Sequence, residues 1–369
     1  MMSGKPPKES ISEIEAPWSA IRKSARNIYR DRRLFKAVNS VSRVKKLSFP
    51  DLKTFCGHYL ISSDQGVFAI QDGQMLQLIQ RDTYGIAVRE GELFIACSND
   101  NYSSVCKCAL PESLRPGGSL KFSEIFRVPI NKSGRIHQIG FYNDALAVAQ
   151  TCSNSIVFLN PSSGEILSEC RPFRDRFGTA IGGDHNHINS ISQCGECLLF
   201  CAYKAGPTAM IGLLHENRVK GYPIRNKGAH DVYLSGKTLY YSDTFGGTFT
   251  DESSECGFLM ANKIRVDEEF FNKPPGFAIR GVSQRGPELV VGHSHKGPRA
   301  KRFDGNGALF RIVENKVVQT VKTPFAQVYD IVRMDGKHFD APPDFLRWDE
   351  INPFLESILG APIYEMRLD

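Results

Sequence analysis

Residues 137–148 read HQIGFYNDALAV: a short apolar strand opened by a polar residue, a tight turn at Asn143-Asp144, and a second, strongly apolar strand. Two such runs joined by turn residues are typical of a β-hairpin. The same unit recurs along the whole chain. Its six copies open at Tyr84, His137, His187, His230, Arg280 and Tyr329.

The openings are separated by 53, 50, 43, 50 and 49 positions. A four-stranded propeller blade with its turns needs about 40–50 residues. One hairpin would fit many folds, but six evenly spaced copies indicate a repeat. The sequence therefore predicts an all-β fold, a six-bladed β-propeller, over residues 52–340.

The last copy stops short, because residues 338–343 turn to a proline pair. Three apolar runs near the N-terminus, 59–61, 66–70 and 75–79, have no hairpin unit of their own. We expect them to supply the missing outer strands, since ring closure removes exposed sheet edges.

The two ends of the chain differ from this pattern. Residues 1–13 are polar and predict a disordered tail. Apolar residues repeat at near-helical spacing within residues 14–47, which predicts a basic amphipathic helix. Residues 341–369 predict a C-terminal tail that packs on the propeller and contains a short helix over 349–359.

Positive charge is concentrated in residues 19–47, which hold ten basic residues and one acid. That segment carries a net charge of +9, whereas the whole chain carries a formal net charge of +6. The rest of the chain therefore sums to −3. A basic amphipathic helix can lie solvated on its own domain, or contact an acidic surface or an anionic membrane. Aromatic residues do not interleave with its basic face, which disfavours nucleic acid.

Composition sets the remaining limits. The chain has 369 residues, 41% of them apolar, and neither a signal-peptide pattern nor a run of about 20 apolar residues. We expect a cytoplasmic protein. Of its ten cysteines, several lie inside apolar strands and are expected to be free thiols. Cys194 and Cys197 form a C-x-x-C pair, but a zinc knuckle needs two such pairs matched in space.

The first residue of an innermost propeller strand points into the central channel, so the repeat brings the opening residues together around one axial pocket. Three of them are histidines, His137, His187 and His230. Three neutral imidazoles suit a divalent metal, zinc first, with iron or copper as alternatives. Metal-free acid–base chemistry and a purely structural role are the competing interpretations.

Other residues complete the predicted pocket. Asp184, Asp231 and Asp330 are close enough in sequence to orient the imidazoles from behind. Arg280 adds a fixed positive charge suited to a carboxylate or phosphate. Three further residues are candidates for substrate contact or proton transfer: Tyr84, Tyr329 and Asn189.

The succession His137-Gln-Ile, His187-Ile-Asn and Arg280-Gly-Val resembles a family of mostly bacterial propeller proteins of unknown function, over roughly residues 80–335. The three histidines are also similar in arrangement to the peptidyl-hydroxyglycine amidating lyases, six-bladed propellers whose axial histidines hold zinc. That second resemblance is architectural and implies a zinc site rather than a reaction. The chain departs from the bacterial family at residues 184–187, which read DHNH.

No nucleophile elbow, zinc-protease helix motif or dinucleotide fingerprint occurs in the chain. We therefore expect a metal-dependent enzyme of lyase or hydrolase type, acting on a small anionic molecule or modified peptide. The alternative is a non-catalytic propeller that serves as a binding module or scaffold.

Overall fold

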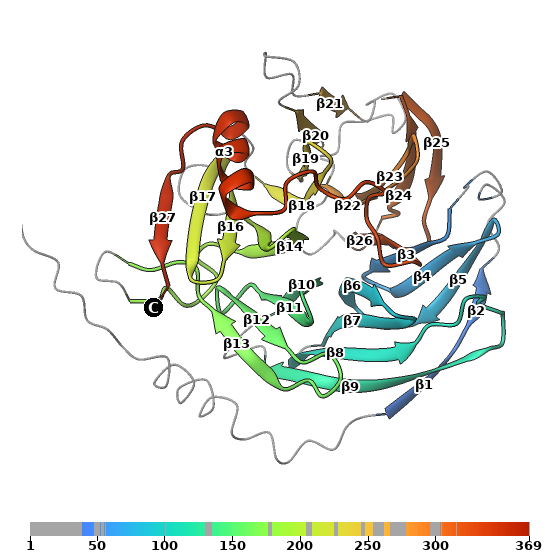
Figure 1. The fold of residues 1–369 in the computed structure, drawn as a ribbon. Coiled ribbons are helices and arrows are strands. Elements are labelled where there is room, and N and C mark those ends of the chain that lie inside the picture. The colour runs from blue at the N-terminus through green and yellow to red at the C-terminus, as the bar shows by residue number, and fades with distance from the viewer. Residues whose placement is uncertain are drawn as a thin grey trace, which may run out of the picture. The chain divides into compact units, whose positions relative to one another are not determined.

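The computed structural model describes residues 39–47, 52, 55, 57–99, 101–129, 135–175, 179–203, 209–224, 228–244, 248–253, 262–265, 278–295, 303, 305–314 and 316–368. Within them the chain is a nearly all-β β-propeller with one α-helix near the C-terminus (Figure 1). The expected disordered tail lies outside the described residues. No described helix combines the length and the apolar character that a membrane crossing requires.

The strands pair into six antiparallel sheets. The innermost strands are β6 (Thr83–Arg89), β10 (Ile136–Tyr142), β14 (Ile188–Cys194), β18 (Ala229–Ser235), β22 (Ala278–Arg285) and β26 (Val328–Arg333). The second strands are β7 (Glu92–Ser98), β11 (Ala145–Gln150), β15 (Cys197–Ala202), β19 (Thr238–Asp243), β23 (Glu288–Ser294) and β3 (Tyr59–Ser63). The third strands are β8 (Tyr102–Ala109), β12 (Ser155–Leu159), β16 (Ala209–His215), β20 (Thr248–Ser253), β24 (Ala308–Val313) and β4 (Gly66–Gln71). The fourth strands are β9 (Ser119–Pro129), β13 (Ile166–Cys170), β17 (Arg218–Ile224), β21 (Asn262–Arg265), β25 (Lys316–Lys322) and β5 (Gln74–Ile79).

The sheets close into a ring. Each innermost strand packs against the innermost strand of the next sheet, from β6 through β26, and β26 packs against β6. Figure 1 shows these six strands gathered around the centre of the ring. Because every innermost strand starts at the same end of the ring, residues far apart in the sequence meet there.

One sheet joins the two ends of the ring. β26 pairs with β3, with Ile331 opposite Ile61, and β4 and β5 continue the sheet outward. An N-terminal and a C-terminal segment thus hold each other through backbone hydrogen bonds, which leaves no open edge where the ring begins.

The expected N-terminal helix is wrong where the structure describes it. β1 (Asn39–Arg43) pairs with β9, and β2 (Lys45–Leu47) pairs with β5. The apolar residues here, Val41, Val44 and Leu47, recur at every third position, a spacing that does not distinguish a helix from an edge strand over so short a stretch. Val44, between the two strands, is buried in the core. Residues 14–38 of that expectation lie outside the described residues.

Helix α3 (Trp348–Leu359) is the C-terminal helix that the sequence predicts. Its apolar face, which includes Ile351 and Leu355, packs on the sheet that begins with β14. β27 (Tyr364–Arg367) then pairs with β17 as a fifth strand of the same sheet. The C-terminal segment therefore covers one sheet rather than closing the ring.

Every innermost strand carries a register shift near its start, at the same end of the ring. A β-bulge leaves one or two residues without a partner on the neighbouring strand and turns their side chains away from the sheet plane. The backbone N–H groups at the bulge are buried and need other acceptors.

Side chains from the preceding sheet supply those acceptors. Four equivalent residues each accept a hydrogen bond from a backbone N–H of the next innermost strand, at 2.7–3.2 Å. The pairs are Gln138 with Ile191, Ser190 with Val232, Asp231 with Gly281, and Asp330 with Ile86. These four contacts, which we call the inter-sheet belt, link four of the six bulges to the preceding sheet.

Glycine occupies the two remaining equivalent positions, Gly85 and Gly281. A Cβ on Gly85 would lie 2.7 Å from the backbone Cα of Gln138 and from the backbone nitrogen of Ile139. Gly281 has a φ of +73° and is just as close to the backbone of Asp330 and Ile331. The neighbouring strand therefore approaches the backbone directly where no side chain reaches across.

We predict that Gly85→Ala destabilises the fold by about 1–3 kcal/mol, because the new methyl group meets backbone rather than a movable side chain. Gly182→Ala is the matched control, since a Cβ there has no atom within 4 Å. Urea unfolding midpoints of the two variants measure the difference. Equal midpoints would contradict the close approach.

Candidate functional site

The bulges define which residues face the axis. The residue before each belt position lies at the bulge of its innermost strand. These residues are Tyr84, His137, Asn189, His230, Arg280 and Tyr329. Five of these residues are the opening residues of their hairpin units in the sequence. The third unit, which opens at His187, is the exception. There the equivalent residue is Asn189, two positions after His187.

His187 therefore reaches the pocket by a different route. It precedes β14, and its φ of +56° is a left-handed conformation that is uncommon for residues other than glycine. The ring nevertheless lies against His137, with ring centroids 5.4 Å apart, and against Tyr203 at 4.3 Å. The turn before β14 thus adds a side chain to the axial end that the strand repeat alone would not supply.

The three histidines meet through His137. Its ring centroid lies 5.4 Å from that of His187 and 5.6 Å from that of His230. Two imidazoles on one tetrahedral zinc have centroids roughly 5 Å apart, given Zn–N bonds of about 2.1 Å. Among the described residues, however, the three do not form a set whose ligand atoms all lie within 4.8 Å of one another. The two pairs that include His137 thus have a ring spacing that fits a shared ion, whereas the three ligand atoms taken together do not meet the limit.

Hydrogen bonds fix the tautomer of His230. Its Nδ1 lies 3.3 Å from the carbonyl oxygen of Gly228 and 2.6 Å from the hydroxyl of Thr244. A carbonyl oxygen only accepts, so Nδ1 carries the proton and Nε2 presents a lone pair. His230 is 4% exposed, and its Nε2 has no hydrogen-bond partner among the described residues. A buried polar nitrogen left in this state is a candidate ligand atom.

His187 is held in the same tautomer. Its Nδ1 lies 2.6 Å from a carboxylate oxygen of Asp184. The ionised carboxylate accepts, so Nδ1 donates and Nε2 is the acceptor nitrogen. A carboxylate or carbonyl behind an imidazole is the usual arrangement around metal-binding histidines. Of the three aspartates expected in this role, Asp184 is the one that contacts a histidine in this way.

Burial and charge keep the pocket imidazoles neutral. Desolvation, followed by the charge of Arg280, lowers the pKa of His137 and the pKa of His230 well below the ordinary value of 6.5. A neutral imidazole can bind a metal or accept a proton at neutral pH. Arg280 is thus close enough to act on both rings, and it offers a fixed positive charge to an anion.

The opposite side of the pocket is phenolic. Tyr84 and Tyr329 stack with ring centroids 4.5 Å apart, and Tyr84 lies 5.6 Å from His137. Burial raises the pKa of Tyr84 to about 12, so this phenol stays protonated and donates. The guanidinium of Arg280 lies 5.9 Å from the ring of Tyr329.

A carboxyl group stands behind the phenols. Burial raises the pKa of Asp82 to about 6, while the charge of Arg135 and a hydrogen bond with Tyr84 oppose the rise. Arg135 itself lies over the ring of Tyr84, at 5.6 Å. Asp82 is therefore positioned to take part in proton exchange with the phenol near neutral pH.

Asn189 serves the ring as well as the pocket. Its amide nitrogen donates to the carbonyl oxygen of Ala229 at 2.9 Å, which links β14 to β18. Its Oδ1 is buried and has no hydrogen-bond partner among the described residues. The amide nitrogen of Asn189 thus binds the next innermost strand, and its Oδ1 is an available hydrogen-bond acceptor.

Sequence reasoning missed four contributors: Tyr203, Thr244, Arg135 and Asp82. None of them belongs to the hairpin repeat, and each reaches the site from a turn or a strand end. Nothing in the sequence around these four residues indicated that they would lie at the site. Asp231 and Asp330 were expected behind the imidazoles, but they are part of the inter-sheet belt.

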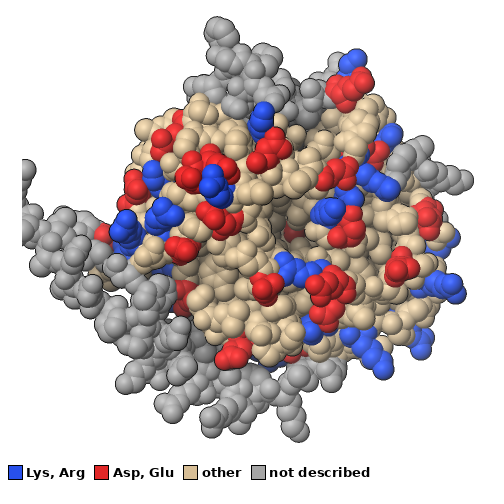
Figure 2. Space-filling model, in the orientation of Figure 1, with Lys and Arg blue, Asp and Glu red and all other residues tan. Residues whose placement is uncertain are grey.

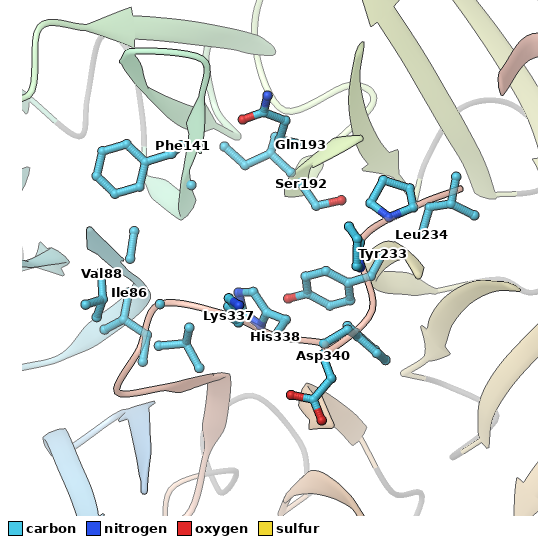
Figure 3. A pocket seen from close by; sticks show the side chains of 18 of the residues that line it. Ile86, Val88, Phe141, Ser192, Gln193, Tyr233, Leu234, Lys337, His338 and Asp340 are labelled. Atoms are coloured by element: carbon cyan, nitrogen blue, oxygen red, sulfur yellow. The ribbon is translucent and has the colours of Figure 1, made fainter. Parts of the chain in front are cut away.

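A second cavity, of about 420 Å³, lies at the other end of the innermost strands. Residues of five innermost strands, β6, β10, β14, β18 and β26, line it together with the segment 336–343, and Figure 3 shows the ring of Tyr233 next to that of His338. Basic and acidic side chains are interspersed over the face seen in Figure 2, which is hollowed near its centre. None of the predicted site residues lines this cavity.

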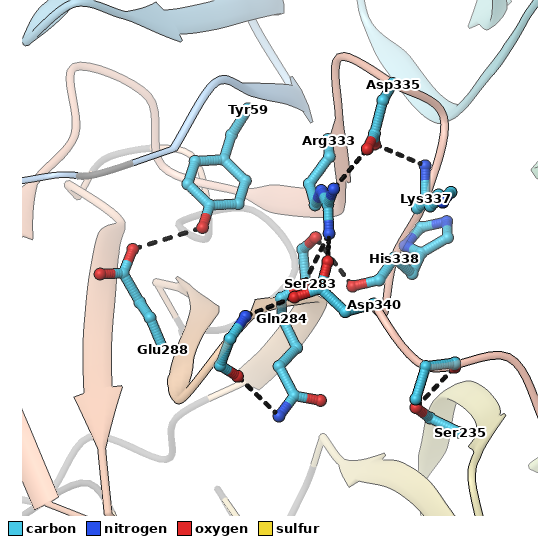
Figure 4. Close-up of polar contacts among 12 residues, drawn as sticks. Tyr59, Ser235, Ser283, Gln284, Glu288, Arg333, Asp335, Lys337, His338 and Asp340 are labelled. Carbon is cyan, nitrogen blue, oxygen red and sulfur yellow. Dashed lines mark hydrogen bonds and ion pairs between the residues drawn. The ribbon is translucent and has the colours of Figure 1, made fainter.

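Polar contacts hold that segment across the ring (Figure 4). Arg333 forms ion pairs with Asp335 and Asp340. The carbonyl oxygen of His338 accepts from the backbone N–H of Gln284 at 2.6 Å and from the Ser283 hydroxyl at 3.0 Å. The segment therefore forms a fixed wall of the second cavity.

No known protein family matches the chain in sequence, and no curated protein matches it. A chain of the nidogen/laminin complex is similar in structure, with a TM-score of 0.52, 9% identity, 74% of this chain covered and 97% of that one. A Bacteroides caccae protein of unknown function has a TM-score of 0.51 and 13% identity, with 74% of this chain and 97% of that one covered. A periplasmic gluconolactonase of Pseudomonas aeruginosa has a TM-score of 0.43 and 11% identity, with 73% of this chain and 82% of that one covered. The first two show the propeller fold alone, and the third is too distant to support an argument. The amidating lyases stay an architectural resemblance.

The belt carboxyls make a pH-dependent contribution to stability. Burial raises the pKa of Asp330 to about 7, and the same cause raises the pKa of Asp231 to about 7. In the folded protein each therefore keeps its proton to higher pH than it does when unfolded, where its pKa is near 3.8. Their stabilising contribution is complete below about pH 4 and is lost as the pH rises to about 7.

We predict that Asp330→Asn, which retains an acceptor for the N–H of Ile86, removes part of this dependence. The melting temperature of the variant minus that of the wild type should rise as the pH goes from 4 to 7. Asp144→Asn, at an exposed turn, is the control and should show no such trend. A difference that stays flat over this range would show that Asp330 ionises normally.

Proposed function

We propose that the chain is an enzyme of lyase or hydrolase type that acts on a small anionic molecule or modified peptide at the histidine end of the ring. The observation that carries this proposal is the convergence of three imidazoles beside a guanidinium, with the buried Nε2 of His230 presented and unpaired. We place the pocket on the axis of a six-bladed ring, one blade for each of the six sheets.

The donor set fits a divalent metal, and zinc suits it best. His137, His187 and His230 would be the ligands, since two are fixed with Nε2 as the acceptor nitrogen and the pKa of His137 and of His230 keeps those rings neutral. Zinc bound there would act as a Lewis acid that polarises a carbonyl group or activates a water molecule. Side-chain rotation would have to bring the three ligand atoms closer together for one ion to bind all of them.

The other residues have separate tasks in this proposal. Arg280 holds the anionic group of the substrate and offsets its charge next to the imidazoles. Tyr84 donates its phenolic proton to a leaving group or oxyanion, and the phenolate regains a proton through Asp82, which takes that proton from solvent. Tyr329 packs on Tyr84 and fixes the plane of its ring.

A second candidate function is a metal-free binding module. The spacing of the three histidines favours it, because their ligand atoms do not all lie within 4.8 Å of one another, and such an arrangement suits a ligand with several acceptors better than a single ion. In that case the three imidazoles and Arg280 bind the anion directly.

Metal content separates the two candidates. We predict that protein loaded with Zn²⁺ and freed of excess metal retains zinc, and that a His137→Ala/His187→Ala/His230→Ala variant retains one equivalent less by elemental analysis. Far-UV circular dichroism of both proteins controls for folding. Equal zinc content in the two folded proteins would exclude the metal site and leave the binding module.

Asp184→Asn tests the tautomer of His187. The amide is a weaker acceptor than the carboxylate, so the variant should bind zinc at the axial site about 10–100-fold more weakly. Imidazole ¹⁵N shifts provide a readout without metal: Nδ1 of His187 is protonated in the wild type and should be less so in the variant. Unchanged zinc affinity together with unchanged ¹⁵N shifts would remove Asp184 from the site.

A further inference from the structure

A second group of potential metal ligands lies in the sheet that begins with β14, at the opposite end of that strand from His187. Glu196, Cys197 and His215 each offer one ligand atom, and these atoms all lie within 4.8 Å of one another. Glu196 is in the turn between β14 and β15, Cys197 begins β15, and His215 ends β16. The pairing of Leu198 with Leu214, continued by one residue, places Cys197 opposite His215.

The orientation of His215 is that of a ligand. Its Nδ1 lies 3.1 Å from the backbone carbonyl oxygen of Glu196, so Nδ1 donates and Nε2 presents its lone pair. Nε2 lies 3.6 Å from a carboxylate oxygen of Glu196. Two ligand atoms on one tetrahedral zinc are roughly 3.4 Å apart for bonds of about 2.1 Å. This edge of the site is therefore already at ligand spacing.

The remaining parts of the site are consistent with a dication. The Cys197 side chain is fully buried, whereas the side chains of Glu196 and His215 are 42% and 13% exposed, so an ion can enter from solvent. A thiolate and a carboxylate together neutralise a dication, so the bound ion would add no net charge beside Arg218. Thiolate with imidazole and carboxylate is a ligand set that favours zinc.

The site would also join three elements. The Glu196 carboxylate accepts a hydrogen bond at 2.7 Å from the backbone N–H of Trp348, the first residue of α3. The ring of Trp348 lies 6.1 Å from that of His215. An ion held here links the β14–β15 turn to the end of β16, and through Glu196 to the start of the helix (Figure 1).

We propose that Glu196, Cys197 and His215 form a structural zinc site, with water as the fourth ligand, that fastens α3 to its sheet. On binding, the Cys197 thiol loses its proton to solvent and its sulfur bonds the ion, and no electrons are transferred. The proposal is independent of the axial site, because it uses no residue of that pocket.

The test combines metal counting with a spectrum. The axial triple-alanine variant should retain one equivalent of zinc, and Cys197→Ala/His215→Ala added to it should retain none. Zinc affinity at this site should fall by more than the roughly 10–100-fold that loss of an outer partner costs. Cys194→Ala, in the same hairpin but outside the ligand group, is the matched control and should retain the metal.

Co²⁺ added to the full-length wild type should give a near-ultraviolet thiolate-to-cobalt band that is absent in Cys197→Ser. Zinc should also raise the melting temperature of the axial variant by roughly 5 °C at concentrations well above the dissociation constant. An axial variant that retains no zinc, or Co²⁺ bound by the wild type without a thiolate band, would overturn the proposal. The axial proposal can fail without either result.

Discussion

The whole arrangement depends on how buried backbone groups are satisfied where the innermost strands bulge. A bulge turns one side chain toward the axis, but it also removes its neighbours from the hydrogen-bond ladder. Buried N–H groups left in that state would cost about 1–3 kcal/mol each. Side chains of the preceding sheet accept those hydrogen bonds, as Asp330 does for Ile86 and Asp231 for Gly281. At four of the six bulges, the contact between neighbouring sheets is therefore also the contact that lets a strand aim a residue into the pocket.

This coupling explains why the pocket combines groups that would otherwise be costly. His230 and Tyr84 are buried and His137 is partly buried, and desolvation is the first cause of the change in the pKa of each. The imidazoles respond by staying neutral and the phenol by staying protonated. Arg280 supplies the positive charge of the site, and an anionic ligand would balance that charge. A rigid ring is needed to hold such a set in place before a ligand arrives.

Much of the fold was accessible from the sequence, because the hairpin unit and its spacing are local patterns that repeat. The convergence of Tyr84, His137, His230, Arg280 and Tyr329 follows from that repeat and is what the structure shows.

Other features could not be predicted from the sequence. The register of the third unit depends on a bulge, so Asn189 rather than His187 holds the equivalent position, and a left-handed residue brings His187 back. The N-terminal expectation failed over residues 39–47 because apolar residues at every third position resemble helical spacing over so short a window, although the segment pairs with β9 and β5 as edge strands. The group Glu196, Cys197 and His215 was missed because only strand pairing joins the C-x-x-C turn to the end of β16.

The measurement that tests the central claim most directly is anomalous diffraction at the zinc edge from crystals grown or soaked with Zn²⁺. Our account predicts a peak on the ring axis about 2.1 Å from Nε2 of His230 and bonded to the rings of His137 and His187 as well. A map with no peak at those three side chains, or with the imidazoles directed away from the axis, would contradict it.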